Sequence, residues 1–284
     1  MGRQSSVGSW VAAVVVVVAV GAAGVYMARK ALHESTPAPA PAAAATAAVA
    51  PAPAIRHPIA QASGPAQAST APLPALENSD ASVIDTLAAL AGGSELRSLL
   101  VSAQLIPNMV ATIDALPRRV VAPRILPLHT PKGGFLTASV DGKTVMSDAN
   151  VARYAPYMHV VASVDPKALV GWYVRYYPLF QQAYVQLGYP KGYFNDRLIA
   201  VIDNLLAAPD LARPAALAQS KPPLYVYADP ALESLSAGQK MLLRIGPANE
   251  ATLKAKLRVI RAQLVGATLP AAAASAPASS RTAQ

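Results

Sequence analysis

The amino-acid sequence predicts a mainly α-helical, compact multi-helix domain with one small β-hairpin, preceded by a single transmembrane helix and a Pro/Ala-rich stalk. Three observations lead to this prediction. Residues 10–27 contain no charged side chain, and residues 29–76 are rich in Pro and Ala. Between residues 77 and 268, apolar side chains recur mostly three and four positions apart, which is the spacing of an amphipathic helix.

Residues 10–28 are the predicted membrane span, because residues 10–27 alone would rise about 27 Å as a helix, close to the hydrocarbon thickness of a bilayer. This apolar run is longer than that of most cleaved signal peptides, so we expect an uncleaved signal anchor. The flanking basic residues, Arg3 on one side and Arg29 and Lys30 on the other, nearly balance. The stalk that follows favours residues 1–9 in the cytoplasm and the bulk of the chain outside it.

The stalk and the last residues of the chain are low-complexity segments. Pro and Ala alternate over residues 37–41 and 51–53, which disfavours helix and favours polyproline II. We therefore expect residues 29–76 to be a disordered linker that lifts the domain off the bilayer. Residues 269–284, rich in Ala, Ser and Pro, are expected to form a disordered tail. The foldable region is residues 77–268.

The first helices of the domain are indicated by their ends. Ser79 and Asp80 predict an N-cap and an acidic first turn, and Gly92-Gly93 predicts where that helix stops. A second helix is expected over residues 94–113, kinked or broken at Pro107. These signals place two helices before the middle of the chain.

A change of periodicity marks the hairpin. Residues 135–140 and 143–146 flank Asp141-Gly142, a pair that favours the tight turn of a two-residue β-hairpin. This is the strongest short hairpin signal in the sequence. We expect one hairpin here, between two groups of helices.

Helical spacing then returns. Asp165-Pro166 predicts the start of a long helix that ends at Gly188, and a further helix is expected over residues 194–206. A short extended piece at residues 224–228 leads into another helix at Asp229-Pro230. The last helix places four apolar residues on one stripe, Leu253, Leu257, Ile260 and Leu264, and four basic residues away from it, Lys254, Lys256, Arg258 and Arg261.

The composition excludes several classes of protein. The chain has no cysteine, so it has neither disulfides nor a cysteine-based metal site. Its formal charge is +9, but residues 77–268 hold 19 basic and 14 acidic side chains with both signs mixed. Such a surface is unlike a nucleic-acid-binding tract, and we expect no nucleic-acid partner. We expect the N-terminal helix to make the contact with lipid. The mild positive charge of the domain is more simply explained as solvated surface charge than as a site for anionic polymers.

No catalytic signature is present in the sequence. The patterns H-E-x-x-H, G-x-S-x-G and G-x-x-x-x-G-K do not occur, and no Lys follows a Ser by three positions. Of the four histidines only His129 and His159 lie in the domain, which is too few for a histidine metal site. The sequence therefore predicts no catalytic residue, no cofactor and no metal ligand.

Two carboxylates form a candidate polar site. Asp114 and Asp203 occupy similar short segments near the ends of predicted helices, where a carboxylate opposes the helix dipole and needs a basic or hydrogen-bonding partner. The candidate partners are Arg118, Arg119 and Arg197. If the two carboxylates faced one cleft they could perform acid–base chemistry, as in glycan cleavage. The favoured interpretation is that each ties helices together.

A cluster of aromatic residues forms a candidate binding surface. Tyr and Arg are enriched at binding surfaces because each joins apolar area to a polar group, and aromatic faces also suit sugar rings. The alternative is that these residues belong to the core. The candidate residues on the helix after Asp165 are Trp172, Arg175, Tyr176, Tyr177 and Tyr184.

Several spaced blocks resemble a known family. They are Leu73–Leu76, Ser79-Asp80, Ile113–Arg118, Tyr177–Gln181, Gly192–Leu198, Tyr227–Glu233, Leu235–Lys240 and Leu243–Pro247. Together they resemble the bacterial domain of unknown function 3014 over roughly residues 73–265. The resemblance implies a membrane anchor followed by a variable stalk, and it implies no established activity. Ala115 and Pro107-Asn108 depart from the pattern expected for this family.

Two functions remain open from the sequence. In the first, the chain is a single-pass protein of the bacterial inner membrane whose periplasmic helical domain binds an envelope protein or peptidoglycan through the aromatic surface. In the second, the domain is a cell-wall glycan hydrolase or lyase that uses Asp114 and Asp203. The first needs exposed tyrosines, and the second needs the two carboxylates in one cleft.

Overall fold

The computed structural model of the chain describes residues 54–61, 72–91, 93–220 and 224–266. The predicted N-terminus at residues 1–9, the predicted membrane span at 10–28 and the predicted tail at 269–284 lie outside the described residues. Among the helices that are described, none combines the length and the apolar character that a membrane crossing requires.

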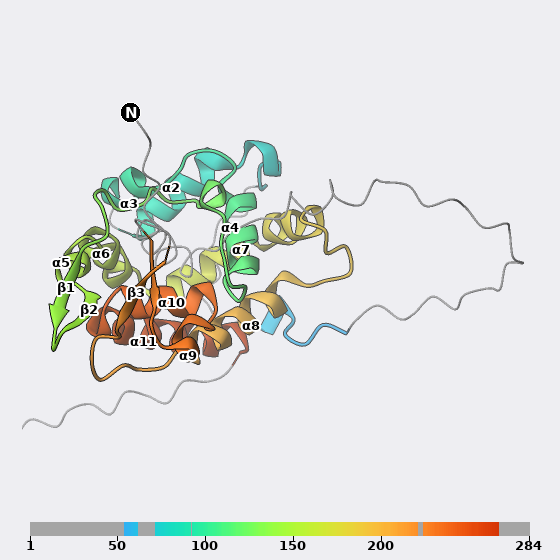
Figure 1. The fold of residues 1–284 in the computed structure, drawn as a ribbon. Helices are drawn as coiled ribbons and strands as arrows, with labels where there is room; N and C mark the ends of the chain where they lie inside the picture. The colour runs from blue at the N-terminus through green and yellow to red at the C-terminus, as the bar shows by residue number, and fades with distance from the viewer. Residues whose placement is uncertain (1–53, 62–71, 92, 221–223, 267–284) are drawn as a thin grey trace, which may run out of the picture.

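The described residues form a mainly α-helical domain with short strands at one end (Figure 1), as the sequence predicts. Single 3₁₀ turns occur at Ile59–Gln61, Leu76–Asn78 and Pro123–Ile125. The α-helices are α2 (Asp80–Leu90), α3 (Ser94–Leu99), α4 (Leu105–Ala115), α5 (Ala149–Ala152), α6 (Ala155–Ser163), α7 (Pro166–Gln186), α8 (Phe194–Leu206), α9 (Pro230–Glu233), α10 (Ala237–Arg244) and α11 (Pro247–Leu264). The strands are β1 (Thr137–Val140), β2 (Lys143–Met146), β3 (Leu217–Gln219) and β4 (Tyr225–Tyr227).

Helix α7 lies at the centre of the domain and packs against α2, α4, α8 and α11. Neighbours cover it on several sides, so its aromatic side chains fill the core. The ring of Phe180 on α7 stacks on Phe194 at the start of α8, with 5.6 Å between ring centroids. Burial of these aromatic side chains together with the aliphatic core residues stabilises the domain.

Two predicted helix starts have different outcomes. Asp165 caps α7, since its carboxylate accepts a hydrogen bond of 2.8 Å from the backbone nitrogen of Ala168, and Pro166 is the first helical residue. Ser79 does not cap α2 through its side chain. Its buried hydroxyl donates instead to the carbonyl of Leu76 at 2.8 Å, so this prediction was wrong in its geometry although the helix begins where expected.

The break between α3 and α4 lies at residues 100–104, before Pro107. Pro107 is the third residue of α4, within the first turn, where a backbone N–H has no partner inside the helix, so proline is tolerated there. Gln104 has a left-handed φ of 52°. The carboxylate of Asp80 on α2 accepts from the backbone nitrogens of Gln104 and Leu105, both at 2.7 Å, and so caps α4 from another helix.

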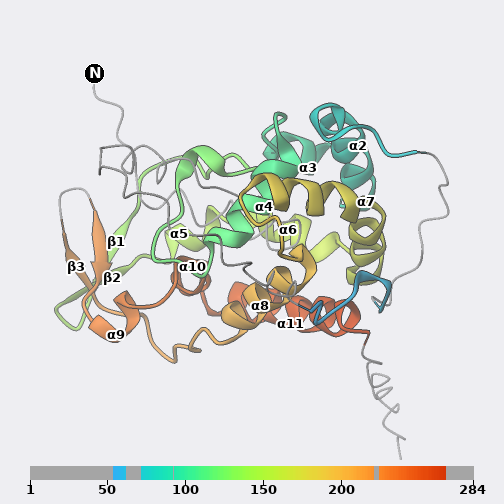
Figure 2. The ribbon, with the colours of Figure 1, turned by 90° about the vertical axis from the view of Figure 1, so that its right-hand side faces the viewer.

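Two antiparallel hairpins lie at one end of the domain (Figures 1 and 2). In the predicted one, Val140 pairs with Lys143 across a turn in which Asp141 and Gly142 have φ values of 49° and 71°, as a type I′ turn requires. The second hairpin, β3–β4, was not predicted beyond its extended second strand. A bridge between Val145 and Ala216 joins the two hairpins.

Part of the predicted stalk is docked on the domain. The carboxylate of Asp196, in the first turn of α8, accepts from the backbone nitrogens of Arg56 at 3.0 Å and His57 at 2.7 Å. The buried side chain of Asn195 donates to the carbonyl of His57 at 2.8 Å. Residues 54–61 are therefore held on α8, and the expectation of a disordered linker over all of 29–76 was wrong for this segment. Both views place it at the opposite end of the domain from β1–β2 (Figures 1 and 2).

Candidate functional site

The predicted aromatic surface is largely core. Trp172, Tyr176 and Tyr184 are 1%, 1% and 6% exposed, so the prediction that they form a binding surface was wrong. The reason is that α2, α4, α8 and α11 pack against α7 and cover its aromatic side, whereas its solvent side carries residues such as Gln182 and Val185. Their polar groups face inward: the indole nitrogen of Trp172 donates to the hydroxyl of Thr86 at 2.9 Å.

The other two members of that set are half-buried. The hydroxyl of Tyr177 donates to the side-chain oxygen of Gln181 at 3.0 Å. The guanidinium of Arg175 lies 5.9 Å from the ring centroid of Tyr176. Both are engaged with their own helix α7, so neither restores the surface that the sequence suggested.

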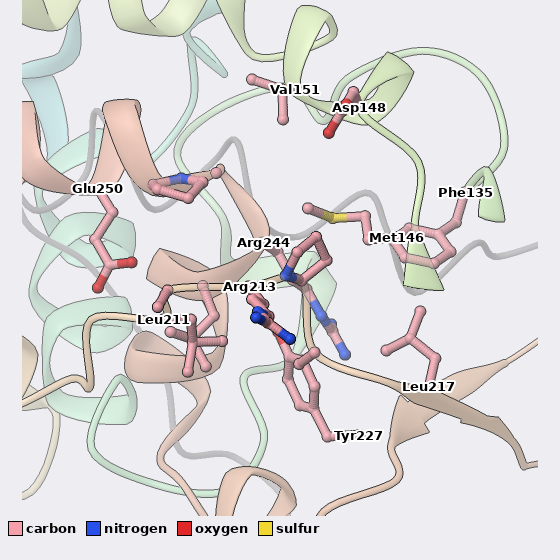
Figure 3. A pocket seen from close by; sticks show the side chains of 16 residues that line it. Phe135, Met146, Asp148, Val151, Leu211, Arg213, Leu217, Tyr227, Arg244 and Glu250 are labelled. Atoms are coloured by element: carbon pink, nitrogen blue, oxygen red, sulfur yellow. The ribbon is translucent and has the colours of Figure 1, made fainter. Parts of the chain in front are cut away.

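A cavity of about 180 Å³ opens at the strand end of the domain (Figure 3). It lies between the first hairpin, the loop that precedes β3, and the junction of α10 and α11. Its apolar lining includes Phe135, Met146, Val151, Leu211, Leu217 and Leu243, and its polar lining includes Asp148, Arg213, Tyr227, Arg244 and Glu250. No motif marks this site in the sequence, because its residues come from segments far apart in the chain.

Two arginines line this cavity without an ion pair. Arg213 is exposed in the loop before β3, and Arg244 is the last residue of α10. Arg244 lies over the ring of Tyr227, 5.6 Å from its centroid, and neither guanidinium forms a salt bridge with any acidic side chain in the described part of the chain. The cavity thus has two positive groups that form no ion pair with a described carboxylate.

The acidic residue at the inner side of the cavity is neutralised by a neighbour. Glu250 is 3% exposed, and its Oε1 lies 2.8 Å from Nζ of Lys254, one turn further along α11. Lys254 Nζ also donates to the carbonyl of Ala208 and to Asp210 Oδ1, both at 2.7 Å. Burial raises the pKa of Glu250, against the opposing effect of Lys254.

Lys254 corrects a prediction about α11. The helical pattern places it away from the apolar stripe, yet the side chain is buried and 2% of the residue is exposed. Burial would lower the pKa of this ammonium group, but its interactions with the carboxylates of Asp210 and Glu250, to which it donates, outweigh burial and the pKa is raised. The Lys254 ammonium therefore stays charged and fixes the loop after α8 to α11.

A second cavity of about 280 Å³ lies beside the first and shares Arg244 with it. Its walls come from Leu116, Val121, Val226 and Met241, among others. Its lysine, Lys240, is already paired with Glu233, with 2.7 Å between Nζ and Oε1. Arg119 also lines this cavity, and neither it nor Arg244 forms an ion pair with a described acidic side chain, so each of the two cavities has two arginines without a salt bridge.

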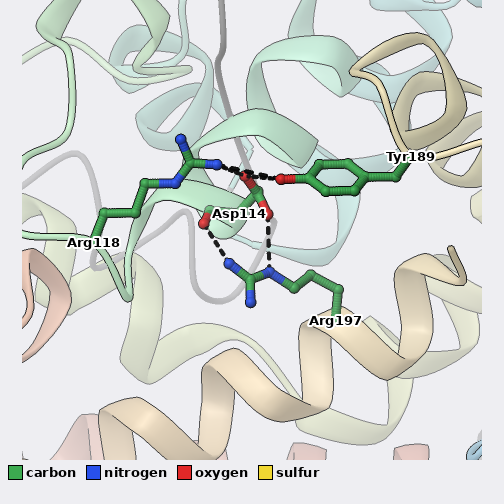
Figure 4. A network of polar contacts seen from close by, with 4 residues as sticks. All are labelled: Asp114, Arg118, Tyr189 and Arg197. Atoms are coloured by element: carbon green, nitrogen blue, oxygen red, sulfur yellow. Dashed lines mark hydrogen bonds and ion pairs between the residues drawn. The ribbon is translucent and has the colours of Figure 1, made fainter.

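Asp114, the first candidate carboxylate, is buried at the end of α4 with 1% of the residue exposed (Figure 4). Arg197 of α8 donates from Nε to Oδ1 at 2.9 Å and from Nη2 to the backbone carbonyl of Asp114 at 2.7 Å. Arg118 and the hydroxyl of Tyr189 both donate to Oδ2, the latter at 3.2 Å. Two of the three basic partners that the sequence suggested are thus confirmed.

This arrangement is a tie between helices. Both carboxylate oxygens of Asp114 are occupied, so a substrate proton would have to displace an arginine or Tyr189. Tyr189 in turn stacks on Tyr184, with 4.5 Å between ring centroids. Burial raises the pKa of Tyr184 to about 12, so this phenol stays neutral beside the ion pairs of Asp114.

Asp203, the second candidate carboxylate, points elsewhere. It is exposed and pairs with Arg261 of α11, whose Nη2 donates to Oδ2 at 3.0 Å. Six residues separate Asp203 from Arg197, which turns the two side chains about 120° apart around α8. The described residues give Asp114 and Asp203 no partner in common, and each ties its helix to another one, which agrees with the favoured interpretation and not with the alternative of a joint site.

Residues 105–261 match the family model described as "Protein of unknown function (DUF3014)". The chain belongs to the DUF3014 family. The match begins at the first residue of α4 and ends within α11, so the DUF3014 region contains Asp114 and every residue that lines the first cavity. No curated protein and no solved structure gives a significant match to the chain. In the part of the domain that is described, no group of three or more metal-binding side chains occurs.

Proposed function

We propose that this chain is a single-pass membrane-anchored protein of the bacterial envelope, and that its DUF3014 domain is a periplasmic binding module. The observation that carries the proposal is the cavity at the strand end, which combines apolar walls with Arg213 and Arg244, two arginines that form no ion pair with a described acidic side chain. Most ligand sites are concave, mainly apolar and contain a few polar groups that orient the ligand. This cavity has that composition.

The position of the docked segment supports presentation of the cavity away from the anchor. Residues 54–61 are held by Asp196, and they lie across the domain from β1–β2 (Figures 1 and 2). A chain that reaches the membrane before residue 54 would approach the domain from the α8 side. The cavity would then face away from the lipid, where an envelope protein or peptidoglycan could reach it.

The state of the two candidate carboxylates favours binding over glycan cleavage. A glycosidase needs two carboxyl groups facing one scissile bond, at most about 10 Å apart and free to exchange protons. Asp114 is saturated by two arginines and Tyr189, and Asp203 pairs with Arg261. The hydrolase hypothesis therefore lacks its catalytic pair.

Site-specific crosslinking in cells tests the proposal. A photoreactive residue replaces Leu217 in the cavity, and a matched control replaces Val185, an exposed apolar residue on α7. We expect an adduct with one reproducible envelope component from position 217 but not from 185, and we expect it to disappear when Arg213→Gln and Arg244→Gln are added. Equal adducts from both positions, or an adduct that survives loss of both arginines, would overturn the proposal.

A further inference from the structure

We infer that the strand-end cavity binds a carboxylate attached to an apolar group, whether this is a small free acid or the last residue of a peptide. The inference rests on the proposed binding function and names the chemistry of its ligand. It follows from three features of the cavity: its charge, its apolar walls and its volume.

The two arginines of the cavity indicate that its ligand is an anion. Arg213 and Arg244 line the same space (Figure 3), and like charges facing one cavity repel each other until an anion lies between them. A carboxylate matches the fork of N–H donors that arginine presents. The Tyr227 ring under Arg244 holds that guanidinium in place.

The acidic groups that face the cavity leave this attraction intact. Glu250 is paired with the buried Lys254, so the charge of this carboxylate is neutralised by Lys254 and not by the arginines of the cavity. Asp148, at the start of α5, is exposed to solvent and screened by water. Lys254 pairs with Asp210 as well as with Glu250, so the positive groups that remain at the cavity are Arg213 and Arg244, which form no ion pair with a described acidic side chain. An anion in the cavity meets these two arginines against the one exposed carboxylate of Asp148.

The walls and the volume select an apolar group of modest size. Side chains of Phe135, Met146, Val151, Leu217 and Leu243 line the cavity. Its volume of about 180 Å³ is below the roughly 300–1,000 Å³ of pockets that hold drug-sized molecules. A space of this size holds one phenyl or branched-alkyl group, with the carboxylate at the arginines.

Titration of the full chain in detergent with 3-phenylpropanoate tests the inference, with binding followed by ligand-observed NMR. The amide of the same acid is the matched control ligand. We expect the acid to bind at least tenfold more tightly than the amide, because the amide cannot pair with the arginines. Arg213→Gln and Arg244→Gln should each weaken acid binding about tenfold, and Arg124→Gln, at an exposed arginine outside the cavity, should leave it unchanged.

A variant with a filled cavity distinguishes binding inside the cavity from attraction to surface charge. Leu217→Trp keeps both arginines but places an indole in the cavity, and a thermal melt confirms that the variant is folded. We expect this variant to lose acid binding. Unchanged binding by Leu217→Trp, or equal binding of acid and amide, would overturn the inference.

Two peptides distinguish the sources of the carboxylate. One ends in phenylalanine with a free carboxylate and the other ends in phenylalanine amide. Tighter binding of the free-carboxylate peptide than of 3-phenylpropanoate identifies a peptide terminus as the ligand, and weaker binding identifies a small acid. The photoreactive residue at position 217 could still give its arginine-dependent adduct in cells when no carboxylate binds. In that case the inference is wrong and the proposed binding function stands.

Discussion

The carboxylate of Asp114 and the guanidinium of Arg197 join α4 to α8 through an ion pair of 2.9 Å, although 83 residues separate them in the chain. Arg197 also binds the backbone carbonyl of Asp114 at 2.7 Å. The contact fixes both the side chain and the end of α4. It gives the buried carboxylate a structural role at the junction of α4 and α8.

Replacing Asp114 should destabilise the domain far more than replacing Asp203. Asp114→Asn leaves Arg118 and Arg197 without their buried counter-charge, and loss of one partner of a buried pair costs about 3 kcal/mol or more. Asp203→Asn removes an exposed pair worth about 1 kcal/mol at most. Urea unfolding followed by circular dichroism measures both. Equal, small effects would contradict the structural role of Asp114.

Lys254 should be required for stability because of Glu250. Lys254→Met leaves the Glu250 carboxylate and the Ala208 carbonyl without their partner, and we expect a loss of about 3 kcal/mol in the free energy of unfolding. Adding Glu250→Gln should recover part of this loss, since the buried charge is then removed. Arg258→Met, at an exposed position on the same helix, is the control. A double variant no more stable than Lys254→Met would argue against the pair.

The docked segment should be released when Asp196 is removed. Asp196→Ala deletes the acceptor of the Arg56 and His57 backbone nitrogens. Hydrogen bonds to a charged group contribute about 1.5–3 kcal/mol each, so tryptic cleavage after Arg56 should accelerate at least tenfold. Asp85→Ala, which removes an exposed carboxylate on α2, should leave the cleavage rate as it is. Equal rates for both variants would show that residues 54–61 are not held by this contact.

Stability should fall at alkaline pH. Burial raises the pKa values of Tyr154, Tyr157 and Tyr184 to about 12, whereas tyrosine in an unfolded chain ionises near pH 10. Their contribution is therefore fully present below pH 10 and is lost as the pH rises toward 12, because the unfolded chain releases these protons first. Phenolate absorbance and denaturant unfolding across this range measure the effect. Tyr184→Phe should show a smaller loss, and a loss as large as that of the unchanged chain would contradict the assignment.

The elements that the sequence predicts well are those with local signals. Asp165-Pro166 starts α7, the Asp141-Gly142 pair forms the turn of β1–β2, and α8 has the predicted bounds of residues 194–206. Each depends on residues close in the chain, such as a cap or a two-residue turn. Two of the basic partners of Asp114 were also predicted, because a carboxylate near a helix end needs compensation.

The elements that it misses depend on contacts between distant segments. The sequence predicts a kink or break at Pro107, but α4 begins before it at Leu105, where Asp80 of another helix caps it. The helical pattern predicts that Lys254 is exposed to solvent, but it is buried because its ammonium group bonds to Ala208 and Asp210 of the loop after α8. The three-residue strand β3 has too few residues for a period-2 pattern to stand out, so only the extended piece that contains β4 was predicted. The cavity beside these strands is lined by segments that lie far apart in the chain, so no local pattern marks it.

Cysteine accessibility in cells tests the central claim most directly, namely that the domain and residues 1–9 lie on opposite sides of a membrane. The chain contains no cysteine, so a single cysteine at Val140, exposed at the hairpin, or at Ser5 gives an unambiguous label. We predict that a membrane-impermeant maleimide labels Val140→Cys in intact spheroplasts and labels Ser5→Cys only after lysis. Labelling of Val140→Cys only after lysis would contradict the account.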